Sequence, residues 1–375
     1  MIEETASAMK PADSTATAFT AAGDHQTRFL LTDAGDGSPR DDFARDVKAG
    51  LSDKSKSLSC RFLYDREGSQ LFEKICELPE YYVTRVETSI LQEHAAEIAE
   101  RFSKKIPSEG FHDVNVSTQA DAARSSPGQI TLVEMGSGSA AKTRILIAEF
   151  LRRYGNLRYV PIDISRSMLE ESSVALLADF PELQIHAIAG EYRNALRRLD
   201  ALPNGPKLFL WLGSNVGNLD RSEAAAFLRI VRQSMSPSDR LLMGVDLRKE
   251  RAILENAYDD SAGITAQFSR NILARINREL GGHFDLETFQ HQAVYNEQVG
   301  RIEIFLVSAR AQRVPIDRLG LDVVFAPGEK IHTENSYKYS PSEIEQLTLA
   351  SGLRVERQWI DSERRFSVNL LAPRA

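Results

Sequence analysis

Residues 130–144, ITLVEMGSGSAAKTR, decide how this chain folds. The stretch opens with an apolar run of strand length, and over residues 140–155 apolar side chains recur at helical spacing. Between the two lie Gly136 and Gly138, and glycine lets a chain turn tightly from a strand into a helix. The stretch therefore predicts a strand, a glycine loop and a helix, the unit from which doubly wound α/β sheets are built.

Further strands of the same kind follow along the chain. They are expected at 158–165, 183–190, 207–215 and 240–247, with a helix from the Ser165/Ser167 region to Leu177 and another at 221–235. Nearly continuous apolar strands that alternate with helices are typical of a parallel sheet buried on both faces. A helix at 341–351 and strands at 354–361 and 366–373 end the chain, as in a class I methyltransferase sheet with its antiparallel last strand. We therefore predict an α/β fold with a doubly wound sheet of the class I methyltransferase (Rossmann-like) type.

Residues 248–337 break this alternation, because a long helical pattern is followed there by several strand-like runs. We expect them, together with residues 40–84, to form an inserted α+β substrate-binding domain over the carboxyl edge of the sheet, where ligands of doubly wound sheets bind. Residues 85–247 and 338–375 would then form the methyltransferase domain. Two segments rich in small polar residues complete the prediction, a disordered tail at 1–38 and a long polar loop at 103–129.

Composition narrows the kinds of partner. The net charge is -7, no long run of Lys or Arg appears, and no apolar run reaches the ~18 residues of a membrane span, so neither nucleic acid nor membrane is expected. Cys60 and Cys76 are the only cysteines and have no zinc-type spacing with histidine, so we expect no metal. The acidic pair Asp259 and Asp260 resembles a metal site or an acid/base dyad, but we expect it to cap a helix or lie on its surface. With acids where a signal peptide has basic residues, a cytoplasmic monomer that acts on a small molecule is expected.

The glycine loop has features of two kinds of binding site. Residues 136–143 read G-x-x-x-x-A-K-T, one residue short of a nucleotide P-loop, because Ala141 stands where a glycine is needed. A P-loop also needs an acidic residue on a partner strand to hold Mg²⁺, and the candidate strand at 208–215, LFLWLGSN, has none. We therefore favour the second ligand, S-adenosylmethionine, which methyltransferases hold in a G-x-G turn that follows an acidic residue.

Acidic residues after the next two strands support this cofactor. Asp163 ends the second strand, where a carboxylate accepts hydrogen bonds from both ribose hydroxyls. Glu191 follows the third strand, where it would take the adenine amino group, and Tyr192 would stack on the base. Singly, each feature keeps a plainer alternative, since the glycines are also typical of an ordinary turn and Glu191 of a solvated loop. The ordered set on successive strands favours the cofactor.

Five long blocks of sequence carry a more specific resemblance. They are LPEYYVTRVETSIL, EMGSGSAAKTR, WLGSNVGN, AYDDSAGITAQFSRNILARINRELGGHFD and EKIHTENSYKY. In this order they resemble the L-histidine Nα-methyltransferase family of ergothioneine biosynthesis, from about Asp46 to the C-terminus. The resemblance implies that three molecules of S-adenosyl-L-methionine, the methyl donor, convert the α-amino group of histidine into the trimethylated form, hercynine.

The resemblance also implies a role for individual residues. The cofactor site would consist of Gly136, Lys142, Asp163, Glu191 and Tyr192, with Lys142 paired to the carboxylate of the cofactor. The α-amino-acid part of the substrate would contact Tyr81, Asn218 and Tyr258, and the imidazole ring would contact Glu334 and Ser336. Tyr64 would lie close to the amine, so that Tyr64 and Tyr81 are the implied catalytic residues.

The chemistry of these residue types agrees with such roles. Transfer of a methyl group from a sulfonium needs a neutral amine and good alignment, so positioning dominates. Tyrosine and asparagine donors hold a carboxylate without adding a charge beside the amine. A carboxylate such as Glu334 accepts from one imidazole nitrogen while Ser336 satisfies the other. We expect solvent or a tyrosine-bound water, rather than a strong base, to take the proton of the amine.

One position departs from the family pattern. Where the histidine enzymes of the family usually carry methionine, this chain has Ile304, a change worth roughly 1 to 3 kcal/mol of discrimination in an apolar pocket. Because Glu334 and Ser336 are intact, histidine remains the expected substrate. The alternatives are an N-methyltransferase that acts on another aromatic amino acid or amine, and a relative that binds cofactor or amino acid without turnover.

Overall fold

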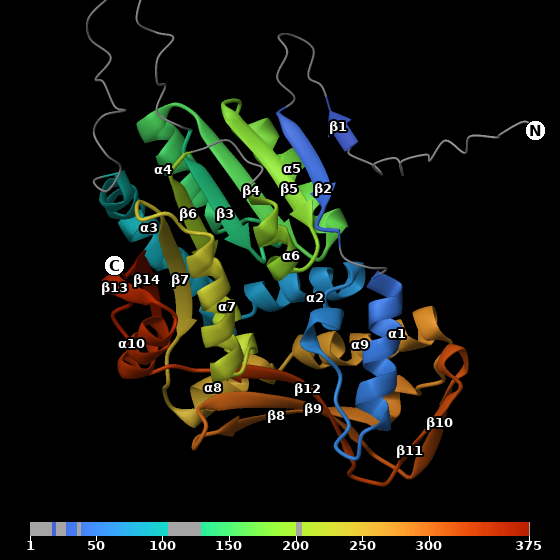
Figure 1. Cartoon of the computed structure of the whole chain (residues 1–375). Helices are drawn as coiled ribbons and strands as arrows, with labels where there is room; N and C mark the ends of the chain where they lie inside the picture. The colour runs from blue at the N-terminus through green and yellow to red at the C-terminus, as the bar shows by residue number, and fades with distance from the viewer. Residues whose placement is uncertain (1–16, 20–27, 36–38, 104–128, 200–204, 375) are drawn as a thin grey trace, which may run out of the picture.

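The computed structural model describes residues 17–19, 28–35, 39–103, 129–199 and 205–374. Over these residues the central sheet has nine strands in the order β1-β2-β5-β4-β3-β6-β7-β14-β13 (Figure 1). Each of the neighbouring pairs from β2 to β7 is parallel. The bounds are β1 Thr17–Phe19, β2 Phe29–Asp33, β3 Thr131–Met135, β4 Leu157–Asp163, β5 Leu183–Ala189, β6 Lys207–Trp211 and β7 Arg240–Asp246.

The last strand along the chain, β14, runs opposite to both of its neighbours in the sheet. Strand β14 (Phe366–Pro373) lies between β7 and β13 (Leu353–Ile360) and is antiparallel to both. The strand order turns at β3, since β4 lies on one side of it and β6 on the other, and ligands of such sheets bind at this switch point. The predicted class I methyltransferase sheet is confirmed.

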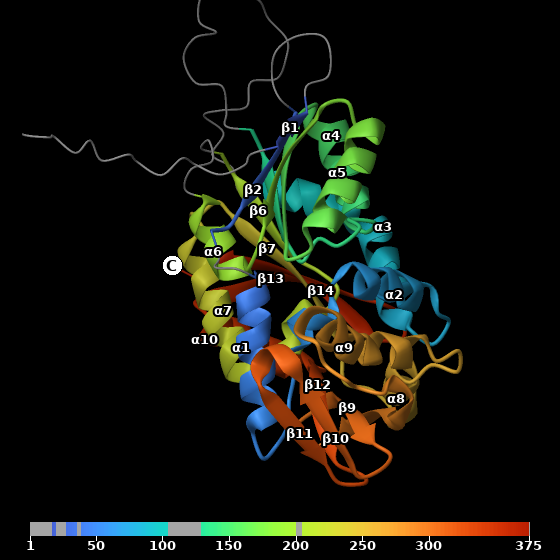
Figure 2. The same cartoon turned by 90° about the vertical axis from the view of Figure 1, so that its right-hand side faces the viewer.

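Helices cover both faces of this sheet (Figure 2). Successive residues of β3 alternate between the faces, so that Leu132 joins one apolar cluster and Val133 the other. No helix in the described ranges is long and apolar enough to cross a membrane. The helices on the first face are α3 (Tyr82–Ser103), α4 (Thr143–Tyr154) and α5 (Arg166–Asp179), and those on the second are α6 (Tyr192–Arg197), α7 (Arg221–Gln233) and α10 (Pro341–Ala350).

Part of the predicted N-terminal tail is an ordered strand. Within residues 1–38, predicted as a disordered tail, β2 is an ordered strand that pairs in parallel with β5, so this part of the prediction is wrong. Its physical reason is burial, because Phe29 and Leu31 are 3% and 0% exposed and point into the core. Most of the tail and most of the polar loop at 103–129 lie outside the described residues.

A second lobe lies beyond the carboxyl edge of the sheet (Figure 1). It consists of α1, the 3₁₀ helix η1 and α2 from the N-terminal part, and of the elements from α8 to β12. A three-stranded sheet of order β12-β9-β8 and the hairpin β10-β11 pack with α9 in this lobe. The bounds are α1 Pro39–Ser52, η1 Cys60–Leu63, α2 Arg66–Glu77, α8 Arg251–Tyr258, α9 Ile264–Leu280, β8 Phe289–Asn296, β9 Arg301–Ser308, β10 Gln312–Ile316, β11 Leu321–Phe325 and β12 Lys330–Tyr337. The domain boundaries given above stay a prediction.

The inserted part of this lobe is connected to the sheet by two adjacent segments of chain, which we call the neck. The chain leaves β7 after Asp246 and returns after β12 at Lys338. Leu247 and Tyr339 form a parallel bridge there. The Tyr339 amide donates to the Asp246 carbonyl oxygen, and the Arg248 amide donates to the Tyr339 carbonyl oxygen, both at 3.0 Å. The outgoing and returning segments are therefore hydrogen-bonded side by side.

Candidate active site

The glycine loop after β3 is shaped by two positive φ angles. Gly136 has φ 75° and Gly138 has φ 48°, values that residues with a Cβ rarely adopt. A Cβ on Gly136 would lie 2.5 Å from the hydroxyl of Tyr192 and 2.8 Å from the side-chain amide of Asn215, whereas at Gly138 nothing lies within 4 Å. Gly136 is thus required by close approach as well as by conformation.

Asp163, at the end of β4, holds this loop in place. Its carboxylate accepts from the Gly138 amide at 3.0 Å and from the Ser165 amide at 2.9 Å. Burial raises the pKa of Asp163, and these backbone N–H groups oppose that rise. Each carboxylate oxygen retains lone pairs, so the group has the acceptors that a ribose diol needs.

Lys142 has a partner that the sequence did not suggest. Its ammonium forms an ion pair with Glu87 of α3, whose side chain is fully buried. The Gly213 amide donates to both oxygens of the same carboxylate, at 3.0 and 2.8 Å. Burial is the largest single effect and favours the neutral amine, but the charge of Glu87, its hydrogen bond to the ammonium and more distant negative groups together raise the pKa of Lys142. Lys142 is thus fixed as a cation beside the glycine loop, and its predicted pairing with the cofactor stays a prediction.

Glu191 and Tyr192 follow β5, as expected, and Tyr192 lies beside the glycine loop. The Arg61 guanidinium of η1 donates to Glu191 at 2.7 Å, so an ion pair joins the second lobe to this edge of the sheet. The ring of Tyr192 packs against Phe227 of α7, with 5.8 Å between the centroids. Neither contact tests the predicted roles in adenine binding.

The predicted substrate residues line a single cavity between the sheet and the second lobe. The inner cavity, as we name it, is bounded by side chains from both regions that are far apart in the sequence. Those that were predicted are Tyr64, Tyr81, Asn218, Tyr258, Ile304, Glu334 and Ser336. Those that sequence reasoning missed are Phe72, Ile75, Gly213, Ser214, Asn215, Ala257, Thr265 and Phe268.

Aromatic rings form one wall of the inner cavity. Tyr64 meets Phe72 and Phe268 edge-on, with ring centroids 5.5 and 5.3 Å apart. Tyr81 meets Tyr258 in the same way at 6.0 Å. Burial is the main cause that raises the pKa of both Tyr64 and Tyr81 well above the usual value, so both phenols are neutral donors. This wall therefore offers hydrogen-bond donors but no strong base.

Glu334 is the acidic group of the inner cavity. Its side chain is 9% exposed, and burial raises its pKa to about 7, although the charge of Lys338 opposes the rise. Among the residues that the structure describes, no group donates a hydrogen bond to this carboxylate. A buried carboxyl without a partner is costly, so Glu334 is poised to bind a ligand group that donates.

A hydroxyl pair also lines the cavity. The Tyr258 hydroxyl and the Ser336 hydroxyl lie 2.8 Å apart, and the buried ammonium of Lys338 donates to both. Sequence reasoning missed Lys338, although it lies two residues beyond Ser336 in a block that was singled out. Asp260 behaves as expected, since it caps α9 by accepting from the amides of Ile264 and Thr265.

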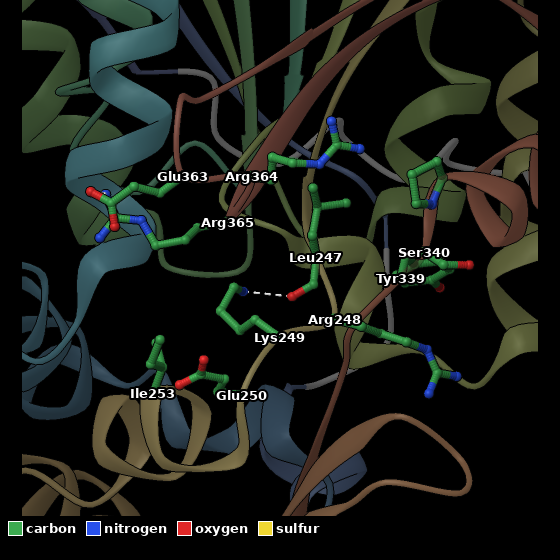
Figure 3. A pocket seen from close by; sticks show the side chains of 11 residues that line it. Leu247, Arg248, Lys249, Glu250, Ile253, Tyr339, Ser340, Glu363, Arg364 and Arg365 are labelled. Atoms are coloured by element: carbon green, nitrogen blue, oxygen red, sulfur yellow. Dashed lines mark hydrogen bonds and ion pairs between the residues drawn. The ribbon is translucent and has the colours of Figure 1, made fainter.

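An outer cavity lies at the neck of the second lobe (Figure 3). It is lined by Arg248, Lys249 and Arg365, among others, and contains no residue of the predicted sites. The Lys249 ammonium donates to the Leu247 carbonyl oxygen at 2.5 Å, as the dashed line in Figure 3 marks. Across the described ranges no cluster of three or more His, Cys, Asp or Glu residues is arranged to hold a metal ion.

Comparison with known proteins adds to this geometry. A family model described as histidine-specific methyltransferase, SAM-dependent, matches residues 43–373. The histidine N-alpha-methyltransferase of Mycobacterium tuberculosis is 40% identical over 88% of this chain and 94% of its own length, and that of Mycolicibacterium smegmatis is 38% identical over 87% and 93%. A more distant relative, the L-tryptophan methyltransferase of Psilocybe serbica, is 26% identical over 83% and 87%.

Among solved structures, magnesium protoporphyrin IX methyltransferase from Synechocystis is 12% identical, with a TM-score of 0.41 over 84% of this chain and 98% of its own. The fold assignment rests on the strand order rather than on this likeness. The family model spans most of the described residues, including the glycine loop and the inner cavity. The chain therefore belongs to the family of histidine-specific, S-adenosylmethionine-dependent methyltransferases.

Proposed function

We propose that this protein transfers methyl groups from S-adenosylmethionine to the α-amino nitrogen of L-histidine. Three successive transfers would give hercynine, the first step of ergothioneine biosynthesis. The observation that carries the proposal is Glu334, a buried carboxyl that accepts no hydrogen bond from any residue the structure describes and that lines the inner cavity. An imidazole N–H is the group that such a carboxylate needs.

The residues around the glycine loop fit the cofactor. Asp163 would accept from the ribose hydroxyls, Gly136 leaves room for close approach, and Lys142 adds a positive charge beside the loop. When bound, S-adenosylmethionine supplies an electrophilic methyl group on its sulfonium. The orientation of Asp163 supports this assignment, because the Gly138 and Ser165 amides fix its carboxylate while leaving lone pairs free.

The inner cavity would hold both the carboxylate and the ring of the amino acid. Tyr81, Asn218 and Tyr258 would bind the carboxylate, and Glu334 and Ser336 would bind the ring. With both of these groups bound, the amine on the carbon between them is held as well, which is the positioning that a displacement reaction needs.

The amine must lose its proton before each transfer. Tyr64 and Tyr81 line the same cavity as neutral phenols and would hold the amine or a water molecule rather than act as strong bases. Each transfer forms a C–N bond as the S–C bond breaks, and the proton from the amine passes to water. We further propose that the protein acts in the cytoplasm as a monomer, with a small amino acid as its partner.

Ile304 supports a second candidate, the methylation of a different aromatic amino acid. It lines the inner cavity opposite Glu334, where the histidine enzymes of the family usually have methionine. A distant relative is named for L-tryptophan, which indicates that the ring pocket varies among related proteins. Glu334 and Ser336 together favour histidine, because the tryptophan ring has one N–H for Glu334 and no second polar nitrogen for Ser336.

The test is mass spectrometry of reactions that contain the purified protein, S-adenosylmethionine and one amino acid at a time. A product from histidine alone, heavier by three methyl groups, is expected. If another amino acid gains methyl groups and histidine does not, the histidine proposal is wrong and the second candidate takes its place. If none reacts, transfer to a common amino acid is excluded.

A further inference from the structure

A fully buried lysine lies directly behind the inner cavity. Lys338 follows β12, and its side chain is 0% exposed. Its ammonium lies 2.8 Å from Asp246, 2.7 Å from the Tyr258 hydroxyl and 2.9 Å from the Ser336 hydroxyl. An ammonium has three N–H donors, so these three partners use all of them.

In the cluster around Lys338, two lysines contact the one carboxylate of Asp246. Asp246, also 0% exposed, pairs with Lys338 on one oxygen and with Lys249 on the other. Two lysines thus share one carboxylate. Two further carboxyl groups interact with these lysines, Asp361 with Lys249 and Glu334 with Lys338. The Lys338 ammonium donates to Tyr258 and Ser336, so a positive charge directly behind these hydroxyls favours an anionic group that binds to them.

Tyr258 and Ser336 contact Lys338 and also line the inner cavity, so the charge of Lys338 acts on a ligand through these two hydroxyls. Tyr258 and Ser336 each accept one hydrogen bond from Lys338, and they share one further hydrogen bond at 2.8 Å. Of their two protons, one is used in that shared bond, so one proton is left to point into the cavity. When an acceptor meets Tyr258, Ser336 donates to Tyr258 and keeps a lone pair of its own for a donor. The pair therefore offers one donor, polarised by the charge behind it.

We infer that Lys338 is a positioning residue that makes a free α-carboxylate a requirement for the substrate. It does so through Tyr258, whose proton it directs toward the carboxylate, and it does not touch the substrate itself. This inference rests on the proposed function, because it takes the amino acid to lie in the inner cavity. The chemical class that it selects is α-amino acids, against the corresponding amines without a carboxylate.

Lys249 provides a matched control in the same cluster. Its ammonium contacts Asp246, the Tyr82 hydroxyl at 2.6 Å and the Leu247 carbonyl oxygen, on the side of the outer cavity (Figure 3). It has no hydrogen bond to Tyr258 or Ser336. A general disturbance of the cluster should therefore follow from a change at either lysine, whereas a loss of carboxylate recognition should follow only from a change at Lys338.

The experiment compares Lys338→Met and Lys249→Met by calorimetry in the presence of S-adenosylhomocysteine. The ligands are L-histidine and histamine, which has the same ring and amine but no carboxylate. For Lys338→Met we expect histidine to bind roughly ten- to hundredfold more weakly, since a hydrogen bond polarised by a charge is lost, while histamine affinity is unchanged. For Lys249→Met we expect the ratio of the two affinities to stay that of the wild type.

Equal weakening of both ligands by Lys338→Met, or no weakening of either, would overturn the inference. If the methionine variant does not fold, Lys338→Gln, which keeps polar donors but has no charge, is measured in its place with the same expectation. The proposed function has its own test in the wild type. If the wild type methylates histidine but Lys338→Met keeps the preference for histidine, only the present inference is wrong.

Discussion

Ile304 and Glu334 are direct partners across the antiparallel ladder between β9 and β12. Both side chains are buried, at 2% and 9% exposure, and both line the inner cavity. Side chains at such positions lie about 4.5 to 5.5 Å apart at their Cβ atoms. The apolar residue therefore sets how much room a ring has beside the carboxyl group.

Ile304→Met should change kcat/KM for histidine by less than about tenfold, because a volume-conserving swap costs under about 1.5 kcal/mol. Ile304→Ala removes more of the side chain, so the ring is held less firmly and a larger ring gains room. We expect Ile304→Ala to lower kcat/KM for histidine. We also expect it to raise the ratio of kcat/KM for tryptophan to kcat/KM for histidine. Steady-state kinetics on both amino acids check this, and an unchanged ratio in Ile304→Ala would remove Ile304 from the ring pocket.

Glu334→Gln should stabilise the folded protein in a pH-dependent manner. Because burial raises the pKa of Glu334 from 4.5 to about 7, the folded chain binds this proton more tightly than the unfolded chain. As the pH rises from 4.5 to about 7, the ionisation of this carboxyl group therefore lowers the free energy of unfolding. Glutamine carries no such charge, so we expect a gain of up to about 3 kcal/mol at about pH 8 that shrinks toward pH 5.

Urea unfolding of wild type and Glu334→Gln at the two pH values measures this difference. Glu134, whose pKa burial likewise raises to about 7, is present in both proteins and cancels. Glu345→Gln, a change at an exposed carboxyl on α10, is the control and should show no such gain. Histidine binding should weaken in Glu334→Gln while S-adenosylhomocysteine binding is kept. A pH-independent difference in stability would contradict the account of a buried, ionisable Glu334.

Two glycines of the cofactor loop should respond differently to alanine. Gly136→Ala adds a methyl group 2.5 Å from the Tyr192 hydroxyl on top of an unfavourable φ, whereas Gly138→Ala adds only the backbone strain. We expect Gly138→Ala to cost roughly 1 kcal/mol of stability and Gly136→Ala clearly more. S-adenosylhomocysteine affinity, measured by calorimetry, should fall more in Gly136→Ala. Equal effects would show that close approach at Gly136 does not matter.

Asp163→Ala should lose cofactor affinity. It removes the acceptor that orients the Gly138 and Ser165 amides as well as the predicted partner of the ribose. Asp179→Ala, at the other end of α5, is a matched control because the aspartate there has an exposed ion pair with Arg144. Calorimetry with S-adenosylhomocysteine distinguishes the two, and wild-type affinity in Asp163→Ala would remove this residue from the cofactor site.

The sheet was predictable because its strands are apolar on both faces and end in turns. Strands such as β3 and β7 are buried along their whole length, so their sequence shows no competing pattern. β2 was missed because it is a short run among small polar residues. In β12 the burial of Glu334 was not predictable from the residues alone, because Glu334 and Ser336 put polar groups on its buried side and so disturb the alternation that marks the inner face of a strand.

The site was predictable only as far as the blocks of resemblance reached. Glu87 lies inside the first of these blocks and Asp246 outside all of them, but neither was predicted, because charged residues are ordinarily on the surface and nothing in their spacing indicates burial. They become recognisable when folding brings α3, β6 and β7 together around Lys142 and Lys338. Such partners are set by tertiary structure and have no local motif.

The paired segments at Leu247 and Tyr339 decide what an exchange of the inserted part would change. Because the two ends of the insertion are already side by side, its length and content have little influence on the entropy of closing the sheet around it. A substitution or exchange beyond the neck leaves the strand order and the glycine loop untouched. Tyr258, Ile304, Glu334 and Ser336 lie in this insertion, whereas Tyr64, Tyr81 and Asn218 lie outside it, so an exchange of the insertion alone would replace one part of the inner cavity and keep the other.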